Sequence, residues 1–272
     1  MTLPNSDQLR AYHEQGYLIL RQAFSHQRIR DLHQAVEHVI ERGRTGHTEL
    51  NWIDREQGLP NRMSHLLHPD KYETAFADWL AEDLVPQLEI FLAGPARHSL
   101  FGMLAGGGGQ SYTMAWHRDI GKPGAADEAV FLQKHHGRSV QFNAPLVAGD
   151  RFLHIVPASH LRASTQDELT AETAGDDADM PDALVVELEP GDIAYYNANL
   201  WHRGWNPEGA KRWTLHCAFW KAAYPVMRHE HGQREALTTP GHLEQMPAVA
   251  AEYIQRYLEQ YPTSDPPHLT DL

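Results

Sequence analysis

The sequence predicts a mainly β protein with flanking helices, whose core is a β-sandwich or jelly roll. Six short β-rich runs lie between residues 98 and 220, separated by Gly, Pro, Asp and Asn, and helical patterns precede and follow them. Several short strands punctuated by turns are typical of sandwiches and jelly rolls. We expect a single domain over 1–272, with a helical N-terminal part to about residue 95, a core over about 96–222 and a helical extension over about 223–272.

Helical periodicity marks both ends of the chain. Ser25 is a good N-cap for a helix whose apolar residues recur from Ile29 to Ile40, and Gly43 is a stop signal. The run "TAFADWLAEDLVPQLEIFLAG" predicts a second helical stretch, which Pro86 interrupts or kinks. The run "PAVAAEYIQRYLEQYP" predicts an amphipathic helix near the C-terminus. We expect all of them to pack on the core.

The middle of the chain consists of short runs with β character. These runs are "HSLFGMLA", "YTMAWHRD", "RSVQFNAPL", "RFLHIVPA", "ALVVELEPGDIAYYN" and "RWTLHCAFW". Side chains alternate between the two faces of a strand. In the last run we expect the inward face to carry Arg212, Thr214, His216 and Ala218. The outward face would then carry Trp213, Leu215, Cys217 and Phe219, which suits packing under helices.

Composition and charge exclude several classes of partner. The formal net charge of −13 disfavours a nucleic-acid groove or an anionic membrane surface, because both need basic patches. Cys217 is the single cysteine, which excludes an internal disulfide and a thiolate zinc site. The chain shows no long apolar run. We therefore expect a cytoplasmic protein with a small-molecule partner, and neither nucleic acid nor membrane.

Three side chains are candidates for a metal site. His117 and Asp119 stand two residues apart, so on a strand they would point to the same face. His202 follows one predicted strand and precedes another. Two histidines and one carboxylate form the ligand set of non-haem Fe(II) oxygenases, which leaves coordination positions open. A zinc-type metallohydrolase could use the same ligands, and a non-catalytic jelly-roll binding protein is a further alternative.

Polar residues on the predicted inward faces are candidates for binding a co-substrate. Arg212 lies ten residues after His202, and its planar guanidinium could hold the far carboxylate of 2-oxoglutarate through two parallel hydrogen bonds. Gln141 and Asn143 alternate with apolar residues. If the apolar set faces the helices, both amides face the barrel and could orient 2-oxoglutarate or the substrate.

Three spaced motifs together resemble the phytanoyl-CoA dioxygenase (PhyH-like) family. They are "WHRD" at 116–119, "VPASH" at 156–160 and "PGDIAYYNANLWHRGWNP" at 190–207, with Arg212 after the last. The start "LRAYHEQGYLILRQAFSHQRIRDLHQAV" is similar too, and the resemblance covers roughly residues 8–222. It implies an Fe(II)- and 2-oxoglutarate-dependent oxygenase on a cupin-like double-stranded β-helix.

The resemblance also implies roles for individual residues. His117, Asp119 and His202 would be the iron ligands, and Arg212 would anchor 2-oxoglutarate. The implied reaction uses O2 to hydroxylate or otherwise oxidise a small molecule, releasing succinate and CO2. The sequence departs from the family where many members carry a Lys, since "FGML" at 101–104 has none.

Other segments could shape substrate choice by their location alone. Trp52, Arg62, Met227 and His229 are the candidates. Residues 163–202 contain no Lys or Arg, and the part "ETAGDDADMPD" predicts a mobile surface loop, with a solvated loop and a lid over the barrel mouth as the two interpretations. Because coenzyme A brings several phosphates and the chain is acidic, we expect a free small metabolite as substrate, not a thioester.

Overall fold

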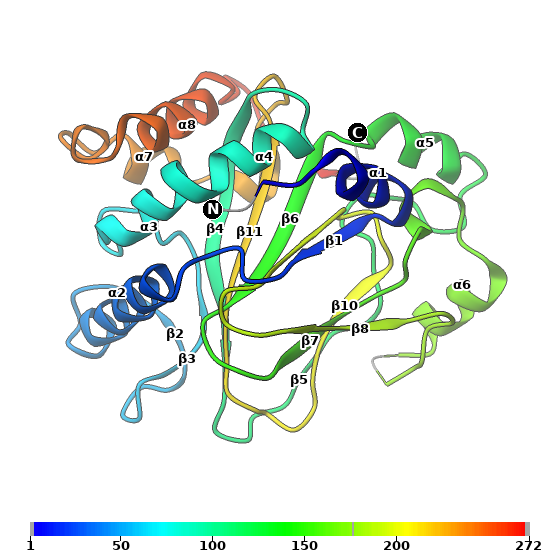
Figure 1. The fold of residues 1–272 in the computed structure, drawn as a ribbon, viewed down its shortest axis with the longest axis horizontal. Coiled ribbons are helices and arrows are strands. Elements are labelled where there is room, and N and C mark those ends of the chain that lie inside the picture. Colours follow the sequence, from blue (N-terminus) through cyan, green and yellow to red (C-terminus); the bar gives the residue numbers. More distant parts are fainter. Residues whose placement is uncertain (1–2, 176, 270–272) are drawn as a thin grey trace.

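Two antiparallel β-sheets form the core of the computed structural model, which describes residues 3–175 and 177–269 (Figure 1). Among the described residues the larger sheet has seven strands and the smaller has four. In order across the larger sheet, the strands are β1 (Tyr17–Leu20), β9 (Ile193–Tyr196), β6 (Ser139–Pro145), β11 (Arg212–Lys221), β4 (Ala96–Gly106), β3 (Leu59–Met63) and β2 (Asn51–Asp54). In the smaller sheet they are β5 (Tyr112–Thr113), β10 (His202–Asn206), β7 (Asp150–Ile155) and β8 (Leu184–Leu188). The expected mainly β, jelly-roll architecture is confirmed.

Helices flank the sheets, and most of them lie on the side of the larger sheet (Figure 1). In chain order the helical segments are α1 (Ser6–Gln15), α2 (His26–Arg44), α3 (Thr74–Trp79), the π-helical turn η1 (Leu80–Leu84), α4 (Val85–Phe91), α5 (Glu128–His135), η2 (Ser159–Leu161), α6 (Gln166–Thr173), η3 (Arg228–Glu230), α7 (Arg234–Leu237), η4 (Leu243–Gln245) and α8 (Ala248–Glu259). Ser25 caps α2 as expected, because its side chain accepts a hydrogen bond from the Arg28 N–H at 3.1 Å.

The main apolar core lies between the larger sheet and the helices α2, α3, α4 and α8. Its members include the outward-facing residues expected on β11, namely Trp213, Leu215, Cys217 and Phe219. Residues that alternate with them, Arg212, His216 and Ala218, line the cavity on the other face of the sheet. One face of β11 thus anchors the helical layer, while the other face is free to build a site.

The N-terminal part differs from the expectation of a mostly helical segment. It also supplies β1 to one edge of the larger sheet, and β2 and β3 to the other. The similarity of the chain's start to the family's opening helix, strand and helix implied β1. β2 and β3 are four and five residues long and carry polar residues or Pro60, so they lack a clear two-residue alternation. The helical stretch at 74–94 is interrupted, as the proline indicated, by a π-helical turn just before Pro86, which has no N–H to donate.

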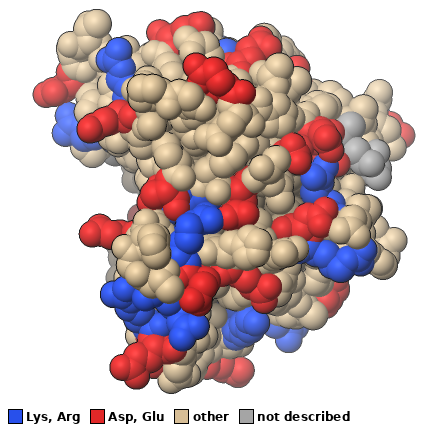
Figure 2. All heavy atoms as spheres, turned by 90° about the vertical axis from the view of Figure 1, so that its left-hand side faces the viewer, with Lys and Arg blue, Asp and Glu red and all other residues tan. Residues whose placement is uncertain are grey.

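Two surface properties bear on partners. In the described part of the chain, no helix combines the length and the apolar character that crossing a membrane requires. Figure 2 shows the face of the molecule on the helical side, where acidic and basic side chains are interspersed in small groups.

Candidate metal centre

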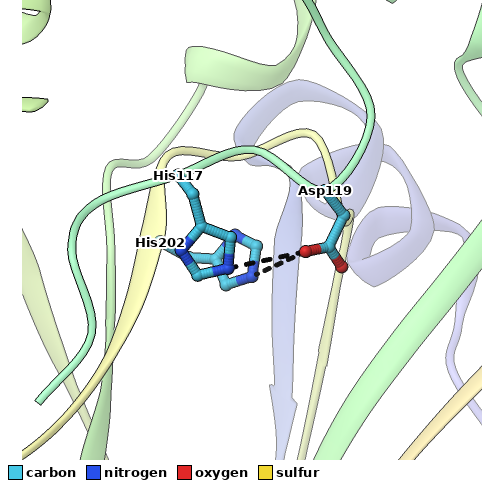
Figure 3. A group of neighbouring side chains, drawn as sticks. All are labelled: His117, Asp119 and His202. Atoms are coloured by element: carbon cyan, nitrogen blue, oxygen red, sulfur yellow. Dashed lines mark ion pairs between the residues drawn. The ribbon is translucent and has the colours of Figure 1, made fainter. Parts of the chain in front are cut away.

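The three metal-ligand candidates converge between the two sheets, although they come from separate parts of the chain. His117 and Asp119 lie in the segment that follows β5, and His202 is the first residue of β10. Nε2 of His117 lies 3.5 Å from Oδ1 of Asp119, and Nε2 of His202 lies 3.7 Å from the same oxygen (Figure 3). Metal–ligand bonds of about 2.1 Å place two ligand atoms at most about 4.2 Å apart. Both separations fit a shared ion.

The hydrogen bonds around these side chains leave the converging atoms free. Nδ1 of His117 donates to the Ala115 carbonyl at 2.9 Å, and Nδ1 of His202 donates to the Leu200 carbonyl at 2.9 Å. A carbonyl only accepts, so Nδ1 carries the proton of the neutral ring and Nε2 keeps its lone pair for a metal. Gln141 donates from Nε2 to Oδ2 of Asp119, which leaves Oδ1 facing both rings.

Burial and charge set the protonation of the group. Burial opposes the ionisation of Asp119, but the interactions of the carboxylate with His117, His202 and Gln141 outweigh it and hold the carboxyl pKa well below its usual range. Burial lowers the pKa of His202 to about 4, against the opposing effect of Asp119. The donor set is therefore an ionised carboxylate and a neutral imidazole beside His117. This is the chemistry that suits Fe(II) with open positions.

The backbone that positions the pair differs from the expected continuous strand over 112–119. Regular strand ends at Thr113, and His117 then pairs with His202 in a single antiparallel bridge, with N–H to carbonyl distances of 3.0 Å in both directions. The Asp119 N–H donates to the Ala198 carbonyl at 2.9 Å. We expected a shared strand face to bring Asp119 to the site. Hydrogen bonds to the segment around His202 do so instead. β10 itself was not among the expected runs.

A feature that sequence reasoning missed surrounds the two histidines. Each stands in the middle of a Trp-His-Arg triplet, the first at 116–118 and the second at 201–203. Because the central histidines pair antiparallel, the Trp of each triplet lies opposite the Arg of the other. Cζ of Arg118 lies 4.9 Å from the Trp201 ring centroid, and Cζ of Arg203 lies 4.7 Å from that of Trp116. Two cation–π stacks therefore join the triplets. The repeated Trp-His-Arg triplet was the sequence signal that could have predicted this pairing.

The acidic stretch packs against these triplets and is not wholly a mobile loop. Its first part forms α6, and Met180 is buried with Trp116 and Trp201 in one apolar cluster. The Ala178 carbonyl accepts a hydrogen bond from Trp116 Nε1 at 3.0 Å and another from Arg203 at 3.0 Å. Apolar residues between the acids provide this docking. Asp176 lies outside the described residues, and the lid stays a prediction.

Arg212 lies in the same cavity as the triad. The cavity holds about 270 Å³, and both sheets contribute to its wall. Arg212 is 3% exposed, and its Nε donates to Oγ1 of Thr214 at 3.1 Å. Thr214 in turn donates to the buried Asp150 carboxylate. This chain holds the guanidinium in place and partly balances its charge.

The two amides expected to face the barrel do so. Gln141 and Asn143 both line the cavity and are almost fully buried. Gln141 contacts Asp119, as described above, and Oδ1 of Asn143 lies 2.9 Å from Nδ1 of His216. Burial, with the charge of Arg62, lowers the pKa of His216 to about 3, so this ring is a neutral donor to the amide oxygen.

The four substrate-choice candidates fall into two groups. Arg62 and His229 line the cavity. Trp52 packs against the main core instead, and Met227 is buried in a separate apolar cluster behind Trp220. Location along the chain could not separate them, because neighbouring residues of one hairpin or one turn face different surroundings.

Comparison with known proteins places the chain in a family. A family model described as phytanoyl-CoA dioxygenase (PhyH) matches residues 12–207, which is more than half of the sequence. The chain belongs to the phytanoyl-CoA dioxygenase family. The resemblance seen in the motifs is thereby confirmed, and with it an oxidoreductase of the dioxygenase type that uses Fe(II), 2-oxoglutarate and O2. No curated protein sequence matches this dioxygenase.

Solved structures share the fold of this family member at low sequence identity. EctD from S. alaskensis, with 2-oxoglutarate and 5-hydroxyectoine, has a TM-score of 0.62 and 14% identity over 92% of this chain and 87% of its own. The carbocyclase SnoK from nogalamycin biosynthesis has a TM-score of 0.59 and 17% identity over 90% and 91%. AviO1 from Streptomyces viridochromogenes Tue57 has a TM-score of 0.58 and 19% identity over 83% and 98%. These likenesses establish the fold.

Proposed function

We propose that this dioxygenase hydroxylates a C–H bond of a free small molecule, with release of succinate and CO2. The observation that carries the proposal is the shared cavity of the His117–Asp119–His202 group and the buried Arg212. Bound Fe(II) with 2-oxoglutarate and O2 supplies the oxidising chemistry. The residues of the chain bind and orient the metal, the co-substrate and the substrate, and they exclude water from the site. Family membership favours this reaction over the zinc hydrolase and the non-catalytic binding protein.

The roles follow from the contacts. His117, His202 and Oδ1 of Asp119 hold the metal, since both Nε2 atoms and that oxygen face one point. Gln141 fixes the carboxylate by bonding its other oxygen. This gives Gln141 an orienting role toward Asp119 in place of the direct contact with 2-oxoglutarate or substrate that its alternation suggested.

Arg212 anchors the far carboxylate of 2-oxoglutarate. Within the described part of the chain, the Arg212 guanidinium donates its hydrogen bond from Nε, with Oγ1 of Thr214 as acceptor. The terminal nitrogens are therefore available as a fork that matches a carboxylate. Asn143, held by His216, offers its amide N–H groups to the cavity and is placed to bind the co-substrate or the substrate.

The proposal is tested in two steps: anaerobic titration with Fe(II) and 2-oxoglutarate, read from the weak visible charge-transfer band, and then admission of O2, read from succinate release. Asp119→Ala should give neither the band nor succinate. Arg212→Lys should keep the metal but weaken 2-oxoglutarate binding by about tenfold or more, because the charge stays and the fork is lost. Arg234→Lys, at an exposed position outside the cavity, is the matched control. Full succinate release by Asp119→Ala would contradict the assignment.

A further inference from the structure

One guanidinium in the cavity wall has no role in the proposed reaction. Among the described residues that line the cavity, the Asp and Arg side chains are Arg62, Asp119, Arg203 and Arg212. Asp119 belongs to the metal group and Arg212 to the co-substrate. The guanidinium of Arg203 stacks 3.9 Å from the Trp205 ring centroid and also on Trp116, so its charge is held among the indoles. Arg62 remains.

Arg62 stands on a different part of the wall from Arg212. It lies on β3 opposite Leu104 of β4, and Leu104 lies opposite Thr214 of β11. With strands about 4.8 Å apart, two strand spacings place Arg62 roughly 10 Å from β11. Arg212 is displaced by two further residues along β11. One five-carbon co-substrate anchored at the buried Arg212 therefore does not need the exposed Arg62.

The surroundings of Arg62 provide no counter-charge. Within residues 3–175 and 177–269 the Arg62 side chain makes no hydrogen bond or ion pair, although the chain has 36 acidic residues against 23 Lys and Arg. The nearby His216 is neutral, for the reason given above. Leu100, Leu104 and Met114 make the adjoining wall apolar. The region thus presents one free cation beside apolar surface at the rim of the cavity.

We propose that Arg62 binds a carboxylate on the substrate, whose apolar body lies against Leu100, Leu104 and Met114. The substrate class is then a small amphipathic carboxylic acid. A guanidinium matches a carboxylate with two parallel hydrogen bonds, and an unpaired one at the mouth of a cavity also attracts anions toward it. The inference rests on the proposed function, since it names the substrate class of the same site.

The experiment compares matched acids and amides on the anaerobic enzyme loaded with Fe(II) and 2-oxoglutarate. The probes are 3-phenylpropionate and octanoate, each with its primary amide, and binding is read from the change in the visible band. A charge-assisted hydrogen bond is worth roughly 1.5–3 kcal/mol, so the acids should bind about tenfold tighter or more than the amides. In Arg62→Gln the acids and the amides should bind about equally well. Arg62→Glu should bind 3-phenylpropylamine more tightly than 3-phenylpropionate or its amide. Arg55→Gln, in the same β2–β3 hairpin but outside the cavity, should keep the ratio.

The possible results separate the two proposals. If the band never forms in the wild-type enzyme, the proposed function fails and this inference fails with it. If the band forms but acids and amides bind equally well, or neither binds, only the carboxylate inference is overturned. It is also overturned if Arg62→Gln weakens 2-oxoglutarate binding while the preference for acids persists, because Arg62 would then belong to the co-substrate site.

Discussion

The two Trp-His-Arg triplets share a sequence and pair with each other, yet their surroundings differ. The first, at 116–118, places its histidine side chain 31% exposed toward the cavity, whereas the histidine side chain of the second, at 201–203, is 7% exposed. The guanidinium of Arg118 faces a buried carboxylate, and that of Arg203 lies among aromatic rings. The same local pattern therefore gives one ligand at the cavity surface and one in the interior.

The cation of the first triplet is held mainly by polar partners. Arg118 donates to the Ser159 carbonyl at 2.7 Å and to the Asn199 carbonyl, and its Nε lies 3.4 Å from Oε1 of Glu128. Burial lowers the pKa of Arg118 to about 10, which leaves it charged at neutral pH. Arg118 thus ties the segment of His117 and Asp119 to the turn at Ser159 and to the loop that leads into His202.

The cation of the second triplet stacks on two indoles. Arg203 lies between Trp116 and Trp205 and donates to the Ala178 carbonyl at 3.0 Å. This carbonyl also accepts from Trp116, so its hydrogen-bonding capacity does not depend on Arg203 alone. The difference teaches that the two stacks are not interchangeable: Arg118 also balances a buried carboxylate, whereas Arg203 stacks on two indoles and donates to a carbonyl.

The largest expected effect comes from removing the histidines themselves. His117→Ala and His202→Ala should both abolish Fe(II) binding at micromolar metal, because each removes one of three ligands. Their effects on the free energy of unfolding should differ, since His202→Ala opens a cavity in the interior and His117→Ala does not. Metal titration and urea unfolding of the metal-free proteins measure the two quantities. Equal destabilisation would remove the proposed contrast between the triplets.

The second prediction concerns the ionic network. Arg118→Met should destabilise the fold by roughly 3–5 kcal/mol, because it leaves the buried carboxylate of Glu128 without its cation. Urea unfolding gives the value. Arg118→Met combined with Glu128→Gln should recover part of the loss, which distinguishes an unbalanced charge from a simple packing defect. A cost below 1 kcal/mol would show that the buried pair contributes little.

The third prediction concerns the aromatic network. Arg203→Met keeps an extended side chain against Trp116 and Trp205 but removes the charge, so the loss should be about 2 kcal/mol. This is smaller than the cost expected for Arg118→Met, because a cation–π contact contributes less than the cation of a buried carboxylate does. If urea unfolding ranks the two variants in the opposite order, the distinction between ionic and aromatic networks is wrong.

The same contrast shows how far the sequence could lead. The motifs around His117, Asp119, His202 and Arg212 predicted a group that the structure does bring to one cavity. Asp119 reaches it through its hydrogen bond to the Ala198 carbonyl, however, and not through the strand face that the two-residue spacing suggested. The alternation along β11 likewise predicted which residues face the helices, and the core confirms it. Periodicity could not predict the pairing of 116 with 203, because it depends on the register of two segments far apart in the chain.

Other features were beyond sequence reasoning for similar physical reasons. Arg62 reaches the cavity only because β3 joins the edge of β4, a pairing that no local pattern records. The acidic segment was expected to remain mobile from its charge, but Ala178 and Met180 alternate with the acids and dock on the indoles. Net charge over a segment hides such alternation, and only the partner surface shows which residues use it.

The smallest expected effect sharpens the comparison through a titration. His154 lies beside the second triplet, 3.4 Å from Nε of Arg203, and burial together with the Arg203 charge lowers its pKa to about 4. A histidine with a depressed folded pKa stabilises the fold fully above its unfolded value near 6.5, and this contribution is lost as the pH falls toward 4. Arg203→Met removes one of the two causes, so the His154 pKa should rise toward the ordinary value.

NMR titration of the His154 ring measures this shift directly. Urea unfolding between pH 6.5 and 4 should show a shallower dependence of the free energy of unfolding on pH than in the wild type. His154→Gln, which cannot titrate, is the control for the slope. Because Arg118 lies in the other network, Arg118→Met should leave the His154 titration where it is, and a similar rise in that variant would mean that the two stacks act as one electrostatic unit.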